Sequence, residues 1–272
     1  MTNSLLDTLR PTDANRVIDL VEAAGHDVVD WSNFGGAHPA TNPKYCYEWC
    51  FRQPSRATIV CLWFENLRQD GGAVTSVVKI DESEFTGPRK KRMLSLKDGL
   101  SQAHSSRAPL RVIVLDGTQY PEDDQKQSVD RRMLDPVPWH VVECDLGSGT
   151  FRIKRGPGES MCLDQFDADA LVDSPTQREV AGKVFVRSAQ LRRDALTRAA
   201  GRCEFCGELG FVAADGRIFL ETHHVVPLSD GGQDSADNIV ALCANHHREA
   251  HHGARALAMR ESLLNSLRRG AS

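Results

Sequence analysis

Two short pairs of metal-binding residue types near the C-terminus constrain the fold of this chain most. Cys203 and Cys206 are separated by two residues, and so are Cys243 and His246. Two such pairs around a longer insert are typical of a site in which four side chains hold Zn²⁺ tetrahedrally. The alternative is a set of buried cysteines without a metal, but this spacing favours zinc. We therefore expect a C-terminal domain stabilised by one structural zinc ion.

Further histidines in the same region are not needed for that zinc ion. Residues 219–227 have the apolar, β-branched pattern of a strand and carry the adjacent pair His223 and His224. A glycine-containing loop follows, and Asn238 opens a second short strand. An isolated histidine on a strand is usually structural, whereas this pair, with a nearby Asn and further histidines, favours a functional site.

The helix expected after Cys243 divides its histidines between two faces. Cys243 and His246 are three residues apart and share one face. His247 and His251 are four residues apart and share another, about 100° round from His246 at 3.6 residues per turn. One helix can therefore hold zinc on one side and a second metal ion on the other, which suits a nuclease and is needless for a zinc finger.

These motifs resemble the HNH endonuclease family, and most of all its McrA-type branch of modification-dependent restriction enzymes. The resemblance spans about Val186 to Gly253, a quarter of the chain. It is carried by Glu221-Thr-His-His-Val-Val-Pro-Leu228, Asp237-Asn-Ile-Val-Ala-Leu-Cys243 and Asn245-His-His-Arg-Glu-Ala-His-His-Gly253. It implies a ββα-metal fold, in which a hairpin and a helix hold one catalytic divalent ion.

The resemblance also implies roles for single residues. His224 matches the general base that activates the attacking water, and Asn238 matches the Asn that braces the hairpin loop. Three histidines match the ligands of the catalytic ion: His223, His247 and, as a third, His251. That ion is expected to be Mg²⁺ or Mn²⁺, with Ni²⁺ or Co²⁺ as alternatives. Many relatives have cysteine at the position of His246, but three cysteines and a histidine also suit zinc.

Two neighbouring residues have weaker assignments. Strand alternation places Glu221 on the face of His223, where it either orients a metal ligand or is solvated. His252 is expected to be a surface histidine.

The longer N-terminal part is expected to form its own α+β domain. Five segments rich in β-branched and aromatic residues predict strands: 57–64, 74–80, 111–115, 139–144 and 151–154. Residues 11–24 predict an amphipathic helix, and helical patterns between the strands are weak. We expect a mixed or largely antiparallel sheet in a domain of residues 1–185. The zinc-stabilised ββα-metal domain would follow over residues 186–272, after an acidic, proline-containing stretch.

An aromatic segment and a basic cluster are the candidate DNA-recognition features of the first domain. Residues 31–64 hold eight of the seventeen aromatic residues. From Tyr45 to Phe51 these alternate as on one face of a strand, so Tyr47 and Trp49 are candidates to contact a flipped base. A core role is the favoured alternative, since aromatic residues dominate cores. A loop containing Arg89, Lys90, Lys91 and Arg92 either grips phosphates or is merely solvated.

Composition limits the class of protein. Charged residues make up 26% and hydrophobic residues 40%, the balance of a globular protein. The net charge of −4 excludes a uniformly basic DNA coat, so DNA contact would use local patches. The N-terminus lacks a signal-peptide pattern, and no apolar run approaches the length of a membrane helix. We expect a cytoplasmic protein without a membrane partner, and leave open a homodimer.

The sequence as a whole predicts a metal-dependent endonuclease acting on double-stranded DNA, in restriction or phage defence. Two alternatives stay open. One is a non-catalytic, zinc-stabilised DNA-binding protein, which would leave His224 and Asn238 without a role. The other is an HNH nuclease of recombination or repair.

Overall fold

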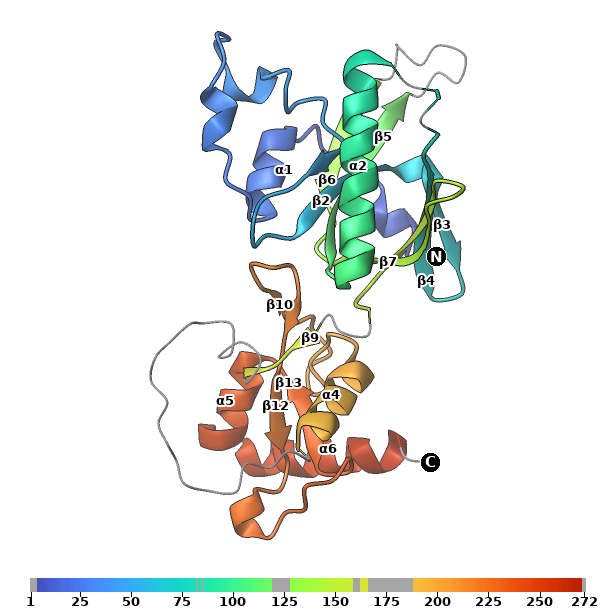
Figure 1. Cartoon of the computed structure of the whole chain (residues 1–272). Coiled ribbons are helices and arrows are strands. Elements are labelled where there is room, and N and C mark those ends of the chain that lie inside the picture. Colours follow the sequence, from blue (N-terminus) through green and yellow to red (C-terminus); the bar gives the residue numbers. More distant parts are fainter. Residues whose placement is uncertain are drawn as a thin grey trace. The chain divides into compact units, whose positions relative to one another are not determined.

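The computed structural model describes residues 4–81, 83–84, 86–118, 128–158, 162–165 and 188–270. The chain divides into two compact units (Figure 1). One comprises Met1–Gly158 with Ala214–Gly216, and the other comprises Glu159–Ala213 and Arg217–Ser272. The expected boundary near residue 185 lies outside the described residues. Strand β9 (Cys162–Leu163) already belongs to the second unit, because it pairs in parallel with β11 (Ile218–Phe219).

A mixed eight-stranded sheet forms the first unit. Its order is β1-β2-β5-β7-β8-β4-β3, with β6 paired to β5 off this path. The bounds are β1 (Cys50–Phe51), β2 (Thr58–Trp63), β3 (Leu67–Asp70), β4 (Ala73–Lys79), β5 (Leu110–Thr118), β6 (Ser128–Leu134), β7 (Trp139–Asp145) and β8 (Thr150–Arg155). Strands β2 and β5 run parallel, and the other pairs are antiparallel. The expected mixed sheet and all five predicted strands are confirmed, and β1, β3 and β6 are additions.

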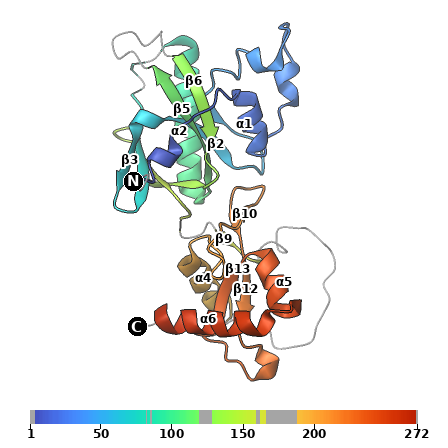
Figure 2. The ribbon, with the colours of Figure 1, turned by 180° about the vertical axis from the view of Figure 1, so that it is seen from behind.

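The central strands β2 and β5 are buried on both faces. Val112 faces one apolar cluster and Ile113 faces another, and Val60 and Ile59 repeat this alternation on β2. Successive side chains of a strand point to opposite faces, so a continuous apolar run marks a strand covered on both sides. Helix α2 (Gly87–Ser106) covers one face, and α1 (Val17–Ala23) packs on the other (Figures 1 and 2).

Helix α2 (Gly87–Ser106) is the main departure from the predicted elements. Its buried residues recur every three or four positions: Met93, Leu96, Gly99, Leu100 and Ala103. At Gly99 an added Cβ would lie 2.5 Å from the Cys50 sulfur, so glycine lets β1 approach the helix. The Arg89–Arg92 cluster, expected in a loop, instead lies in the first turns of α2. Pro88 fits there because the first turn needs no backbone N–H donor.

The second unit is built around an antiparallel hairpin. Strand β12 (Glu221–His224) pairs with β13 (Ile239–Leu242), with His223 opposite Val240 and His224 opposite Ile239. All four residues of β13 are buried. Helix α5 (Ala244–His252) follows directly. The hairpin and the helix that follows confirm the expected ββα order.

The remaining elements frame these two cores. They are α4 (Ser188–Ala199), β10 (Phe211–Val212), α6 (Ala256–Gly270) and the 3-10 helices η1 (Asp7–Leu9), η2 (Val29–Ser32), η3 (Pro39–Thr41), η4 (Phe64–Asn66) and η5 (Leu228–Asp230). No helix in the described part of the chain has both the length and the apolar character needed to cross a bilayer.

Candidate active site

The four expected zinc ligands meet beside the start of α5. The donor atoms of Cys203, Cys206, Cys243 and His246 all lie within 4.8 Å of one another. Nδ1 of His246 is 3.0 Å from the Cys243 sulfur and 3.9 Å from the Cys203 sulfur. Three thiols and one imidazole form a donor set that zinc takes in tetrahedral structural sites, so these residues fit the expected ion.

A tight turn presents the first cysteine pair. The backbone N–H of Gly207 donates to the carbonyl of Cys203 at 2.8 Å, and the N–H of Cys203 donates to the carbonyl of Glu208 at 2.8 Å. Burial opposes ionisation of the Cys203 thiol, but hydrogen bonds from the backbone of Cys206 and Cys243 outweigh it and lower the pKa of this thiol. Backbone donors aimed at the sulfur favour the thiolate form that a metal ion binds.

Glu204 fastens this turn to the hairpin and to α4. Its carboxylate accepts the backbone N–H of Ala241 at 2.7 Å and pairs with both ends of the Arg198 guanidinium at 2.7 and 3.0 Å. The bidentate pair fixes the carboxylate geometry. The cysteine turn is therefore held to β13 by the side chain of Glu204 as well as by its backbone N–H, which donates to the Ala241 carbonyl.

Three histidines form a second donor cluster. Donor atoms of His223 on β12 and of His247 and His251 on α5 lie within 4.8 Å of one another. The Nε2 atoms of His247 and His251 are 3.2 Å apart, and the His223 ring stands edge-on to both, with centroids 5.2 and 4.7 Å away. Converging imidazoles at this separation can hold a divalent transition metal ion. The structure therefore brings together the three histidines that the sequence nominates as ligands of a second ion.

The surroundings favour the neutral form of His223 and His251 and orient the ring of His247. Burial, helped by the neighbouring His247 and His251, lowers the pKa of His223 to about 4. Burial and His247 likewise lower the pKa of His251. Glu221 hydrogen-bonds Nδ1 of His247, which leaves Nε2 of that ring facing the cluster. Of the two alternatives for Glu221, the structure selects contact with a cluster histidine over solvation, as outer carboxylates do in metal sites.

His224 lies beside this cluster on β12 and has a partner of its own. Its Nε2 is 2.9 Å from Oδ1 of Asp234, in the loop between the two strands. Both side chains are partly exposed, at 25% and 22%. When the Nε2–H group of His224 donates a hydrogen bond to this carboxylate, Nδ1 keeps a lone pair that can accept a proton.

Asn238 braces the loop that carries Asp234. Its Oδ1 accepts the backbone N–H of Val226 at 2.8 Å, and its Nδ2 donates to the carbonyls of Val226 at 2.9 Å and Gln233 at 2.8 Å. Gly232 must be small, because an added Cβ would lie 2.0 Å from the Val226 carbonyl oxygen. The buried amide thus closes the loop in the way expected of this Asn.

Residues 203–253 match the model of the HNH endonuclease family. The second unit carries an HNH endonuclease domain. A curated relative, the Type IV methyl-directed restriction enzyme EcoKMcrA of Escherichia coli (strain K12), is 43% identical over 96 residues. That match covers 35% of this chain and 35% of the relative, so the chain aligns with only about a third of that enzyme.

Two solved structures also match the chain that carries this HNH domain. The modification dependent TagI restriction endonuclease is 18% identical, over 90% of this chain and 78% of that chain, with a TM-score of 0.25. The Type IV phosphorothioation-dependent restriction endonuclease ScoMcrA is 15% identical, over 78% of this chain and 54% of that chain, with a TM-score of 0.27. Superpositions this poor do not establish a common overall fold.

Outside the HNH domain, some residues of the aromatic segment 31–64 pack in the core and others line a groove. The predicted strand from Tyr45 to Phe51 is wrong, because β1 holds only Cys50–Phe51 and a turn precedes it. Trp31 stacks on Tyr45 and on Phe51, with ring centroids 4.9 and 6.0 Å away, and belongs to the apolar core. Packing on Trp31 therefore overrides the alternating pattern for these rings.

Tyr47 and Trp49 remain accessible and share a groove with two of the predicted cations. Tyr47 is 63% exposed, and the Arg92 guanidinium lies 5.4 Å from its ring centroid. Arg89, Arg92, Tyr47 and Trp49 all line one groove of about 620 Å³. Lys90 and Lys91 are exposed on α2 and do not line it. Trp63 from β2, another member of the aromatic segment, also lines the groove. Two lining cations had no sequence signal of their own: Lys79 from β4 and Arg132 from β6.

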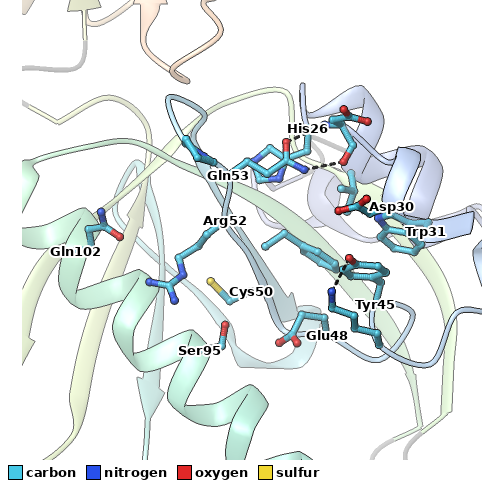
Figure 3. A pocket seen from close by; sticks show the side chains of 15 residues that line it. His26, Asp30, Trp31, Tyr45, Glu48, Cys50, Arg52, Gln53, Ser95 and Gln102 are labelled. Atoms are coloured by element: carbon cyan, nitrogen blue, oxygen red, sulfur yellow. Dashed lines mark hydrogen bonds between the residues drawn. The ribbon is translucent and has the colours of Figure 1, made fainter. Parts of the chain in front are cut away.

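A second cavity, of about 490 Å³, is also lined by residues of the Tyr45–Cys50 segment (Figure 3). Its wall includes the stacked Trp31 and Tyr45, with Arg52 reaching across toward α2. The acidic side chains of Asp27, Asp30 and Glu48 also line it.

Proposed function

We propose that this protein is a metal-dependent endonuclease that hydrolyses phosphodiester bonds in double-stranded DNA, as part of restriction. The observation that carries the proposal is the pairing of two donor clusters on one hairpin and helix. The cysteine cluster suits a structural zinc ion, which is enough to stabilise a small domain. The three converging histidines next to His224 are therefore not needed for a structural metal site. A second metal position beside a candidate base is an arrangement for chemistry.

His224 is the proposed general base. Its Nδ1 takes a proton from the attacking water, and Asp234 stabilises the imidazolium that forms while fixing the tautomer and the ring orientation. Asn238 keeps the Asp234 loop closed against Val226.

His223, His247 and His251 are the proposed ligands of the second ion, and Glu221 orients His247 for that purpose. When bound, a divalent ion there supplies Lewis-acid stabilisation of the phosphate charge and of the leaving 3′ oxygen. Cys203, Cys206, Cys243 and His246 would hold zinc and keep α5 against the hairpin.

The first unit is proposed to select the DNA. Its groove offers aromatic side chains and cations, the chemistry that holds bases and phosphates. The methyl-directed activity named for the E. coli relative supports modified DNA as the target class.

Digestion of matched plasmids tests the proposal. The plasmids would be unmodified or carry modified cytosines, and each would be incubated with the full chain and Mn²⁺ or Mg²⁺. We expect strand cleavage by the wild type and a loss of about 10²–10⁴ in rate for His224→Ala. His224→Ala should still bind DNA and melt at the wild-type temperature. Metal-independent binding without cleavage of either plasmid would instead support a non-catalytic DNA-binding protein.

A further inference from the structure

The two hollows of the first unit differ in charge. Of the residues that the structure describes, four cations line the groove, Lys79, Arg89, Arg92 and Arg132, together with one acid, Glu48. The cavity in Figure 3 is lined by three acids and the two cations Lys44 and Arg52. Phosphates are held by local cations and repelled by carboxylates. Charge therefore singles out the groove as the surface that accepts a polyanion.

The interior of the groove suits a flat, apolar group rather than a phosphate. Trp49 and Trp63 are half-buried in its walls, whereas Tyr47 stands exposed at its rim beside Arg92. Every nucleobase has a π-face that stacks on such rings, and arginine adds a cation–π contact. A volume of about 620 Å³ is ample for a nucleobase with its sugar.

We infer that this groove binds one nucleotide that has been turned out of the DNA helix, with its base among Tyr47, Trp49 and Trp63 and its flanking phosphates on Arg89 and Arg92. Half-buried indoles cannot reach a base that stays stacked inside a duplex, so only an extruded base fills the groove. The inference rests on DNA being the substrate of the proposed nuclease. It assigns the choice of target to this groove and excludes the acidic cavity.

Binding of defined duplexes by the full-length His224→Ala protein, without added divalent ion, tests the inference. Three probes of one sequence would be compared: a fully paired duplex, the same duplex with a single central mismatch, and the single strand. Unpairing costs least at a mismatch, so that probe should bind at least about fivefold more tightly than the paired duplex. If the single strand binds tightly and this binding depends on Tyr47, the groove still holds a nucleotide, but one supplied by single-stranded DNA.

Matched variants in the same background locate the effect. Tyr47→Ala should weaken binding of the mismatched probe at least about fivefold by removing a stacking surface, and Tyr47→Trp should restore it. Arg92→Ala should weaken the binding of all three probes. It should also reduce, by about one, the slope of the logarithm of the binding constant against the logarithm of the salt concentration. Arg52→Ala, in the acidic cavity, should change neither the affinity for any probe nor the salt dependence of binding. Because Tyr47 is exposed, its loss should leave the melting temperature unchanged.

Two results would overturn the inference: equal affinity for paired and mismatched duplexes, or a Tyr47→Ala protein that binds every probe like Arg52→Ala. Cleavage by the otherwise wild-type protein keeps the two proposals apart. If that protein cuts DNA while the groove variants bind normally, the groove assignment fails and the nuclease stands. If it cuts no DNA under any metal condition, the proposed function fails.

Discussion

His224 and Asp234 form a histidine–carboxylate pair, with 2.9 Å between Nε2 and Oδ1, across the hairpin that carries the HNH motif. The two residues are ten positions apart, and the loop between them is closed by the buried amide of Asn238. A carboxylate on one ring nitrogen determines which nitrogen is left to accept a proton. The pair therefore sets both the aim and the tautomer of the proposed base.

Replacing Asp234 should slow cleavage without weakening DNA binding. Asp234→Ala removes the acceptor for Nε2–H, so we expect kcat to fall at least about tenfold while KM for DNA stays the same. Asp234→Glu should recover part of the rate. Asp237→Asn is the control, since Asp237 is exposed in the same loop and accepts a bond from Ser235 instead. Equal kcat for Asp234→Ala and Asp237→Asn would show that the pair has no role in the reaction.

Neighbouring histidines on α5 should behave differently. His251→Ala removes a member of the three-histidine cluster, so the concentration of Mn²⁺ needed for half-maximal cleavage should rise about 10–100-fold. His252→Ala should leave the metal requirement unchanged, because His252 is exposed and outside the cluster. Metal titrations of both variants check this, and matching curves would remove His251 from the ligand set.

The three-histidine cluster should also rank metal ions. Imidazole suits transition metals, whereas Mg²⁺ prefers oxygen ligands. We expect cleavage with Mn²⁺, Co²⁺ or Ni²⁺ to exceed cleavage with Mg²⁺ at equal concentration. Rates measured on one plasmid with each ion provide the test. A clear preference for Mg²⁺ would require oxygen ligands from outside this cluster.

Loss of a cysteine ligand should unfold the second unit. Cys203→Ser and Cys243→Ser remove donors from the zinc site, and zinc binding contributes directly to the folding of small domains. Elemental analysis should find one tightly held zinc per wild-type chain and none in these variants, which should also lose a melting transition. Cys162→Ser is the control, since Cys162 packs on the same core outside the donor set. A zinc-free wild-type protein that still cuts DNA would contradict the assignment.

Acid should destabilise the first unit through His26. Burial lowers the pKa of His26, although its bond to the Ala57 carbonyl at 2.7 Å acts in the other direction. The unfolded chain therefore takes up a proton at a higher pH than the folded chain. The stability contributed by neutral His26 is complete above about pH 6.5 and is lost as the pH falls below it. Thermal melting at pH 7.5 and pH 5 should show this loss, with a smaller difference for His26→Gln. The exposed His38→Gln should keep the full difference.

Local geometry explains why so much of the HNH site could be predicted. The cysteine pair and the two faces of α5 depend on spacings of two to four residues, and helical periodicity alone converts such spacings into directions. Strand alternation likewise placed Glu221 with His223. The chemistry of the residue types then indicated zinc for one cluster and a second ion for the other.

Contacts between distant segments decided the rest. Asp234 contacts His224 because the side chain of Asn238 holds the loop closed. The same loop also contains Asp230 and Asp237, and nothing in the sequence indicates which of the three aspartates makes that contact. Helix α2 has a narrow buried stripe that includes Gly99, so its apolar periodicity is weak in the sequence. The reason for the glycine is visible only in the structure, where β1 packs against it.

The sequence by itself indicated the candidate metal ligands and the hairpin-helix order, because both follow from short-range backbone geometry. Only the tertiary structure separated Tyr47 from Tyr45. These two residues are only two positions apart in the aromatic segment. Tyr47 lines a groove that also contains cations, whereas Tyr45 stacks on Trp31 and packs against the apolar core. Trp31 packs against Tyr45, whereas Arg92 of helix α2 lies over the ring of Tyr47, and no local pattern encodes those packing partners.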